Sequence, residues 1–111
     1  TMQGIAEALV VGEHAGLKRE QLLEMIGQSA VATPMLNAKQ NMLLQEQFPS
    51  AFMISLLSKD LGLLMDQARK NDIDLPLSEA ASRTFAEAAN NGKGEMDMAA
   101  IWLELQERNK K

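Results

Sequence analysis

The segment from Phe48 to Ala68 constrains this chain most, because it is almost continuously apolar apart from the charged pair Lys59-Asp60 near its middle. At helical spacing Lys59 shares a stripe with Leu56 and Leu63, and Asp60 falls on the adjoining stripe. A helix that is apolar on most sides is expected to be buried on most sides, and burying a charge without a partner is costly. We therefore expect the pair to face a polar cleft, a ligand or another subunit. The plainer alternative is a lysine that extends to water and an aspartate in a surface ion pair.

The composition favours helices throughout. Residues typical of strands are scarce, with three Val, five Ile, three Thr and no Tyr, whereas Leu, Ala, Met, Glu and Gln are abundant. A chain of 111 residues with 46% apolar content fits a single domain. We predict an all-α fold, a compact bundle of about six helices. The expected helices cover residues 2–14, 18–28, 34–46, 51–70, 76–90 and 98–107.

Residues with known positional preferences mark several helix ends. Thr33 is a good N-cap with Pro34 at the first helical position, and Asp97 is expected to cap the last helix. Gly16 can supply a left-handed ending to the first helix. That helix begins without a cap, although its apolar periodicity is already running at Met2. We therefore expect it to be the end of a longer helix.

Several classes of function are disfavoured by composition. The absence of cysteine excludes disulfides and thiolate chemistry, and the single histidine, His14, excludes a multi-histidine metal site. A net charge of −4 without a basic cluster argues against a nucleic-acid partner. No apolar run reaches membrane-spanning length, and no signal peptide is visible. We expect no metal, no nucleic acid and no membrane contact, and a cytoplasmic location.

Other notable residues have a structural and a functional interpretation. The eight methionines could form an adaptable binding groove or fill the core. Asp97 could contact a ligand, although an aspartate ahead of a helix is first an N-cap. Phe52 could belong to the core or to a site. Apolar spacing predicts burial for a set in the second and fifth helices, namely Leu22, Leu23, Met25, Ile26, Leu77, Ala81, Phe85 and Ala88.

Four segments, taken in order, resemble the carboxyl-terminal helical domain of the β-hydroxyacid dehydrogenase family. This family includes 3-hydroxyisobutyrate dehydrogenase, tartronate semialdehyde reductase and glyoxylate/succinic semialdehyde reductase. The stretch FPSAF at 48–52 is most similar to the glyoxylate/succinic semialdehyde branch. The four segments are AEALVVGEHAGL at 6–17, the run 52–61 ending in SKDL, LPLSEAA at 75–81 and GKGEMDMAA at 92–100.

The resemblance implies a domain like the carboxyl-terminal domain of 6-phosphogluconate dehydrogenase, spanning residues 1–111 and closing over an active-site cleft. It also implies an amino-terminal Rossmann domain, absent from this chain, that binds most of the NAD or NADP. The family's catalytic lysine and asparagine would lie upstream of Thr1, so no catalytic residue is expected here. Lys59 would reach the cofactor or the substrate, while Phe52 would line the substrate pocket and Asp60 would support it.

The implied reaction is hydride transfer between NAD(P)H and the carbonyl of a small semialdehyde or keto acid, which yields a β-hydroxyacid or related alcohol. The chain alone is expected to be inactive and to self-associate, and the parent to be a homo-oligomer. This hypothesis predicts that Lys59 and Asp60 line a groove beside the start of the first helix. Two alternatives are a non-catalytic dimerisation domain and a methionine-rich module that binds a partner helix. The second of these predicts an apolar patch away from Lys59.

Overall fold

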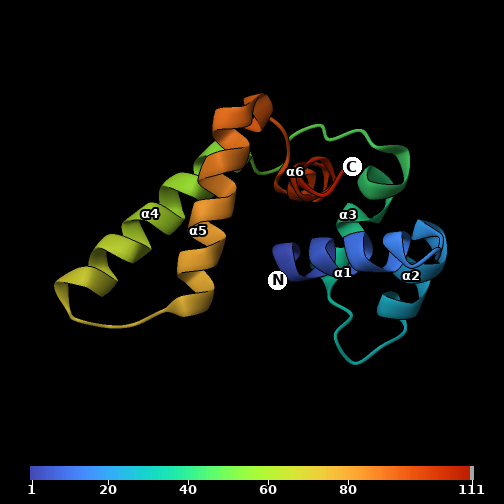
Figure 1. The fold of residues 1–111 in the computed structure, drawn as a ribbon, viewed down its shortest axis with the longest axis horizontal. Coiled ribbons are helices and arrows are strands. Elements are labelled where there is room, and N and C mark those ends of the chain that lie inside the picture. The colour runs from blue at the N-terminus through green and yellow to red at the C-terminus, as the bar shows by residue number, and fades with distance from the viewer. Residues whose placement is uncertain (111) are drawn as a thin grey trace.

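The computed structural model describes residues 1–110 and shows an all-helical chain (Figure 1), which confirms the predicted class and the six α-helices. A kinked turn, η1, in which Asn91 and Gly92 have non-helical backbone angles, and one 3-10 turn, η2, interrupt the series. In chain order the elements are α1 Met2–His14, α2 Arg19–Gly27, α3 Pro34–Gln45, α4 Ile54–Lys70, α5 Pro76–Ala88, η1 Ala89–Lys93, η2 Met98–Ala100 and α6 Ile101–Arg108.

Helices α1, α2, α3 and α6 form the body of the molecule, which we call the four-helix body (Figure 1). Helix α1 packs against both α6 and α2, and α2 packs against α3. Their facing stripes supply the core, because apolar residues three, four and seven apart share one side of a helix. The largest fully buried side chains in this core include Leu9, Leu23, Leu36, Leu43, Ile101 and Trp102.

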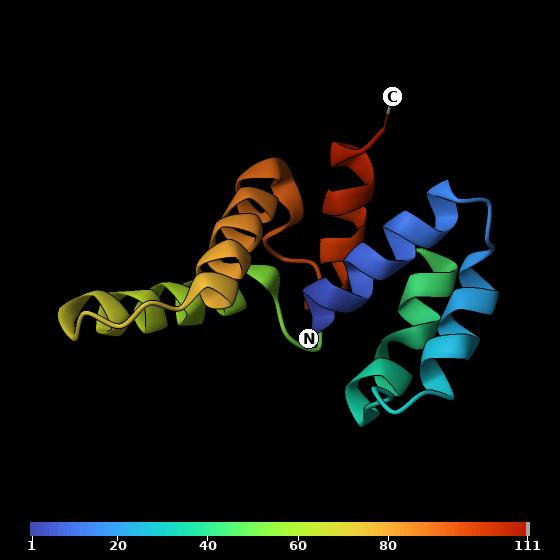
Figure 2. The same ribbon diagram turned by 60° about the horizontal axis from the view of Figure 1, so that its bottom comes forward.

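Helices α4 and α5 pack against each other and project away from the body as a helical hairpin, which we call the arm (Figures 1 and 2). The turn between Lys70 and Pro76 forms its outer end, and η1 and η2 join its inner end to α6. The projection gives the molecule an elongated outline of 43 × 31 × 29 Å.

Burial on the arm differs from the prediction. Only Ile54 and Ala68 of α4 are buried, so the expectation of a helix buried on most sides is wrong for this chain. Leu77 is 82% exposed, and in the body Met25 is 64% exposed. Spacing along a helix identifies an apolar face, but a face is buried only where another element lies against it, and none of the described elements covers these residues.

Most predicted helix ends are confirmed. Thr33 Oγ1 accepts a hydrogen bond from the Leu36 amide at 3.2 Å, and Asp97 accepts one from the Ala99 amide at 3.0 Å. Gly16 has a φ of +96°, as a left-handed ending requires. The fourth helix begins at Ile54 rather than at residue 51, for a reason that lies in the site described next. No helix within residues 1–110 has both the length and the hydrophobicity needed to cross a bilayer.

Candidate functional site

Phe52 lies in the bend that leads into α4, and the residue is half-buried. Its amide donates a hydrogen bond to Asp97 Oδ1 at 3.0 Å, and its carbonyl accepts one from the Met98 amide at 2.8 Å. The next residue, Met53, pairs with Asp97 as an isolated antiparallel bridge. These bonds hold residues 52 and 53 outside the helix, at positions that the sequence predicted to belong to it.

The Asp97 carboxylate is completely buried and accepts four hydrogen bonds. Oδ1 receives the Lys39 ammonium at 2.9 Å and the amides of Ala51 and Phe52 at 3.0 Å each, while Oδ2 receives the amide of Ala99 at 3.0 Å. Burial alone would raise the pKa of Asp97, but these four donors outweigh it and hold the pKa below its ordinary value. One carboxylate therefore joins α3, the segment before α4 and η2.

Lys59 and Asp60 lie in the middle of α4, and both are exposed. The residues that α4 turns toward the rest of the chain include Ile54, Leu57 and Leu61, and Lys59 lies on the opposite side of the helix. Neither charged side chain forms an ion pair or a hydrogen bond with any residue from 1 to 110. Both are therefore available to a molecule or domain outside this chain.

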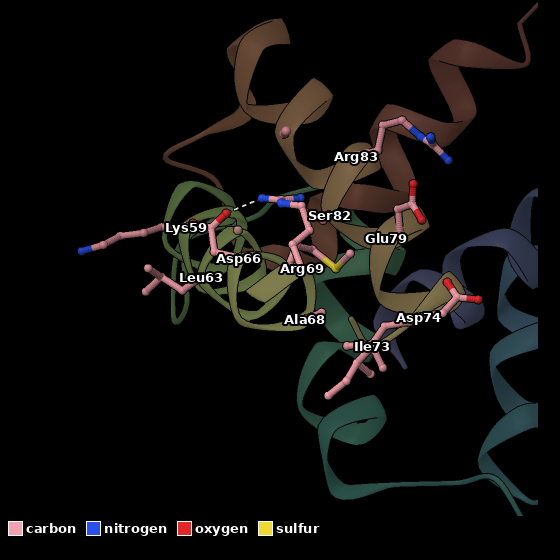
Figure 3. A pocket seen from close by; sticks show the side chains of 14 residues that line it. Lys59, Leu63, Asp66, Ala68, Arg69, Ile73, Asp74, Glu79, Ser82 and Arg83 are labelled. Atoms are coloured by element: carbon pink, nitrogen blue, oxygen red, sulfur yellow. Dashed lines mark hydrogen bonds and ion pairs between the residues drawn. The ribbon is translucent and has the colours of Figure 1, made fainter. Parts of the chain in front are cut away.

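Lys59 stands at the edge of a shallow pocket of about 680 Å³ between α4 and α5 (Figure 3). The pocket carries charges of both signs, and Arg69 is paired with Asp66 within it. In Figure 3 the Lys59 side chain extends away from the other labelled residues. Phe52 and Asp60 do not line this pocket, so the chain alone does not bring the three predicted site residues into one cavity.

A second pocket, of about 400 Å³, lies between the start of α1 and the inner end of the arm, and its lining is mainly apolar. The groove expected beside the start of the first helix is therefore present. Its α4 residues are Leu57 and Leu61, however, and not Lys59 and Asp60 as predicted, because those two charges lie on other sides of the helix. Its further lining includes Met2, Gln3, Phe85 and Met98.

The sequence reasoning missed the buried partner of Asp97. This partner, Lys39, is only 6% exposed and lies on the same face of α3 as the buried Leu36 and Leu43. A lysine at core spacing between two buried leucines is a detectable signal, because a cation on that face requires a buried anion nearby. Asp97 itself was correctly identified as a helix cap.

No group of three or more His, Cys, Asp or Glu side chains within residues 1–110 is arranged to hold a metal ion. The chain also offers no glycine-rich loop between a strand and a helix, because the described residues form no β-sheet. Lys59 could contribute to a dinucleotide site an ammonium group without an ion-pair partner in residues 1–110, a property that it shares with the exposed Lys18 and Lys70.

Comparison with known proteins identifies the family. A profile described as the NAD-binding domain of NADP-dependent 3-hydroxyisobutyrate dehydrogenase matches residues 1–105. The chain is 34% identical over 101 residues to 2-(hydroxymethyl)glutarate dehydrogenase from Eubacterium barkeri, which covers 90% of this chain and 34% of that protein. It is 28% identical over 100 residues to glyoxylate/succinic semialdehyde reductase 1 from Arabidopsis thaliana, covering 90% and 35%.

The fold has a counterpart among solved structures. The crystal structure of 3-hydroxyisobutyrate dehydrogenase from Salmonella typhimurium superposes with a TM-score of 0.85 at 24% identity, covering 92% of this chain and 36% of that one. The chain thus spans about a third of the length of the proteins that it matches. Because the profile extends over nearly all of its residues, the chain belongs to the family of the NAD-binding domain of NADP-dependent 3-hydroxyisobutyrate dehydrogenase.

Proposed function

We propose that this chain is the carboxyl-terminal helical domain of an NAD(P)-dependent β-hydroxyacid dehydrogenase or semialdehyde reductase. The single observation that carries the proposal is the family match over residues 1–105. In the parent enzyme a Rossmann domain carries the dinucleotide, and the helical domain closes over the cleft that contains the substrate. The reaction is hydride transfer to or from the carbonyl carbon of a small semialdehyde or keto acid.

Lys59 is the residue that we assign to the cofactor or to an anionic substrate group. Its exposure and its lack of an ion-pair partner within residues 1–110 support this role, since a paired lysine would first have to give up its partner. A bound NAD(P)H supplies the hydride. The Lys59 ammonium would hold an amide or carboxylate oxygen by charge-assisted hydrogen bonds, which are about twice as strong as neutral ones.

Phe52 and Asp60 are assigned to the substrate side of the same cleft. Hydrogen bonds hold both the amide and the carbonyl of Phe52, and its ring can serve as an apolar wall of the pocket. Asp60 is exposed one position after Lys59 and can orient either the lysine or a polar group of the substrate. Proton transfer to the substrate oxygen requires a further group that this chain does not supply, so the chain alone should be inactive.

The arm and the start of α1 supply the surface against which the remainder of the enzyme would pack. The apolar pocket between them can receive a preceding turn of helix, because it is lined by Met2, Leu57 and Leu61. Leu56, Leu63 and Leu64 are 43%, 56% and 42% exposed on α4 and would become covered in the assembled protein. Leu56 and Leu63 lie within about one turn of Lys59 on the same side of α4, so they favour a homo-oligomer or interdomain contact beside this lysine.

The test is the activity of the parent enzyme, assayed by NADPH or NADH absorbance. The candidate substrates are glyoxylate, succinic semialdehyde, methylmalonate semialdehyde and tartronate semialdehyde. The variant Lys59→Ala should lower kcat/KM at least about tenfold, as expected when a charge-assisted contact is lost. Lys70→Ala is the matched control, since Lys70 is an exposed lysine in the last turn of the same helix and should leave kcat/KM unchanged.

Two results would contradict the proposal. Wild-type kinetics in the Lys59→Ala enzyme would remove the role of Lys59. A parent that binds neither dinucleotide and turns over none of the four substrates would favour the alternative of a non-catalytic dimerisation domain.

A further inference from the structure

Both backbone polar groups of Phe52 are bound by residues 97 and 98. The amide donates to the Asp97 carboxylate and the carbonyl accepts from the Met98 amide, at 3.0 and 2.8 Å. The preceding amide, that of Ala51, donates to the same carboxylate oxygen at 3.0 Å. With the peptide groups on either side of it held, the direction of the Phe52 Cα–Cβ bond is set by Asp97 and the Met98 amide together.

Asp97 in turn depends on Lys39. The carboxylate is completely buried, and Lys39 Nζ at 2.9 Å is the one cation that contacts it among residues 1–110. A buried carboxylate without a counter-charge is strongly disfavoured, and it would take up a proton or draw in water. A protonated Asp97 could no longer accept from all four donors, so loss of the lysine weakens the set of bonds that joins Ala51, Phe52 and Ala99.

A second buried pair provides an internal contrast. Lys93 Nζ lies 3.0 Å from Glu104 Oε1, and the two residues are each 4% exposed. Their other side-chain contacts go to Asn91, Glu107 and Arg108, and none reaches residues 48–60. The two pairs are alike in charge and burial, but only the Lys39–Asp97 pair holds the segment that carries Phe52.

We infer that Lys39 and Asp97 are positioning residues for substrate recognition, acting through the Phe52 backbone and touching no reacting atom. The inference rests on the proposed function, in which Phe52 lines the substrate pocket. The addition is that the buried ion pair of Lys39 and Asp97, 58 positions apart in the chain, determines the position of Phe52 in the pocket. Loss of the pair should change the affinity for the carbonyl substrate and leave the chemical step nearly intact.

The first test needs only this chain and reads the position of the ring directly. The three phenylalanines are replaced by 4-fluorophenylalanine, and the fluorine spectrum is assigned with the variants Phe52→Leu and Phe85→Leu. Asp97→Asn should shift or broaden the Phe52 signal and leave the Phe85 signal in place. Glu104→Gln, which weakens the control pair, should leave the Phe52 signal unchanged.

Folding of the variants is controlled separately. The double variant Lys39→Met with Asp97→Asn leaves no unpaired charge in the interior, so it should stay folded even where the single variant does not. Its Phe52 signal should also be displaced, because an asparagine at position 97 offers one acceptor oxygen where the carboxylate offers two to the amides of Ala51, Phe52 and Ala99. A wild-type Phe52 signal in the folded double variant would overturn the inference.

The second test uses the parent enzyme and separates KM from kcat. Asp97→Asn should raise the KM for the carbonyl substrate about five- to tenfold, as a displaced pocket wall predicts, with kcat changed less than about twofold. The KM for NAD(P)H should not change. Glu104→Gln should leave kcat and both KM values unchanged even where it lowers thermal stability as much as Asp97→Asn does. If Asp97 acted only by stabilising the fold, the two variants would have the same effect on these parameters.

Phe52→Ala distinguishes failure of the inference from failure of the proposed function. If Phe52→Ala leaves the KM for the carbonyl substrate unchanged, the assignment of Phe52 to the substrate pocket is wrong, and the inference falls with it. If Phe52→Ala raises this KM and Asp97→Asn does not, the proposed function stands and only the positioning role is wrong.

Discussion

The chain contains two lysine–aspartate pairs that differ in almost every physical respect. Lys59 and Asp60 are neighbours in sequence, and both are exposed on the arm without an ion-pair partner within residues 1–110. Lys39 and Asp97 are 58 residues apart, yet they form a buried ion pair at 2.9 Å. Adjacent residues on a helix point about 100° apart, whereas residues on different elements can face each other. The distant pair therefore joins separate segments of the fold, and the adjacent pair forms no ion pair within residues 1–110.

The largest expected difference between the pairs is in stability. Lys39→Met leaves the Asp97 carboxylate buried without a counter-charge, and it should lower the free energy of unfolding by about 3–5 kcal/mol. Urea unfolding followed by circular dichroism measures this loss. A loss below about 1 kcal/mol would mean that water or another group replaces the lysine, and the contrast between the two pairs would no longer hold.

The loss of folding stability at acidic pH should depend on Asp97. Its pKa is lower in the folded protein than in the unfolded chain, so the unfolded state binds more protons at acidic pH. The stability due to this carboxylate is fully present above its unfolded pKa and is lost as the pH falls below about 4. Urea midpoints should therefore fall less steeply with pH in Asp97→Asn than in the wild type. The urea midpoint should still fall with pH to some extent in both proteins, because the pKa of Glu104 is also lowered.

Two glycine substitutions compare the packing of the body and the arm. A Cβ at Gly12 would lie 2.6 Å from both Leu22 Cδ atoms, so Gly12→Ala should destabilise the chain by about 1–3 kcal/mol. A Cβ at Gly62 in α4 meets nothing within 4 Å, so Gly62→Ala should stabilise it by about 0.5–1 kcal/mol. Thermal unfolding of the two variants should therefore move in opposite directions. Equal shifts would show that the arm is packed as tightly as the body.

The smallest stability effect is expected at the exposed pair. Lys59→Met and Asp60→Asn should each change the free energy of unfolding by less than about 0.5 kcal/mol, because neither group has an ion-pair partner within residues 1–110. The same urea series used for Lys39→Met provides the measurement. A loss above about 1 kcal/mol at Lys59 would indicate a structural contact and would weaken its assignment to a ligand.

Much of the local structure could be predicted from the sequence. Thr33-Pro34, Gly16 and Asp97 mark helix ends through short-range geometry, which depends only on nearby residues. The start of α4 could not be predicted in this way. Nothing in the local sequence keeps residues 51–53 out of the helix, and two of their amides instead donate to the distant Asp97 carboxylate. The roles of Phe52, Lys59 and Asp60 remain predictions, because they concern contacts with a domain and a substrate outside this chain.

The sequence by itself determined the helical class, most helix ends and the family, since these depend on composition, short-range spacing and the order of a few segments. Only the tertiary structure decided which charges are buried and which are free. A lysine at core spacing can be neutralised only by an anion that the fold brings to it from a distant segment. An apolar helix stripe stays exposed unless another element packs on it. Both outcomes depend on contacts between residues far apart in the chain, which spacing along one helix does not encode.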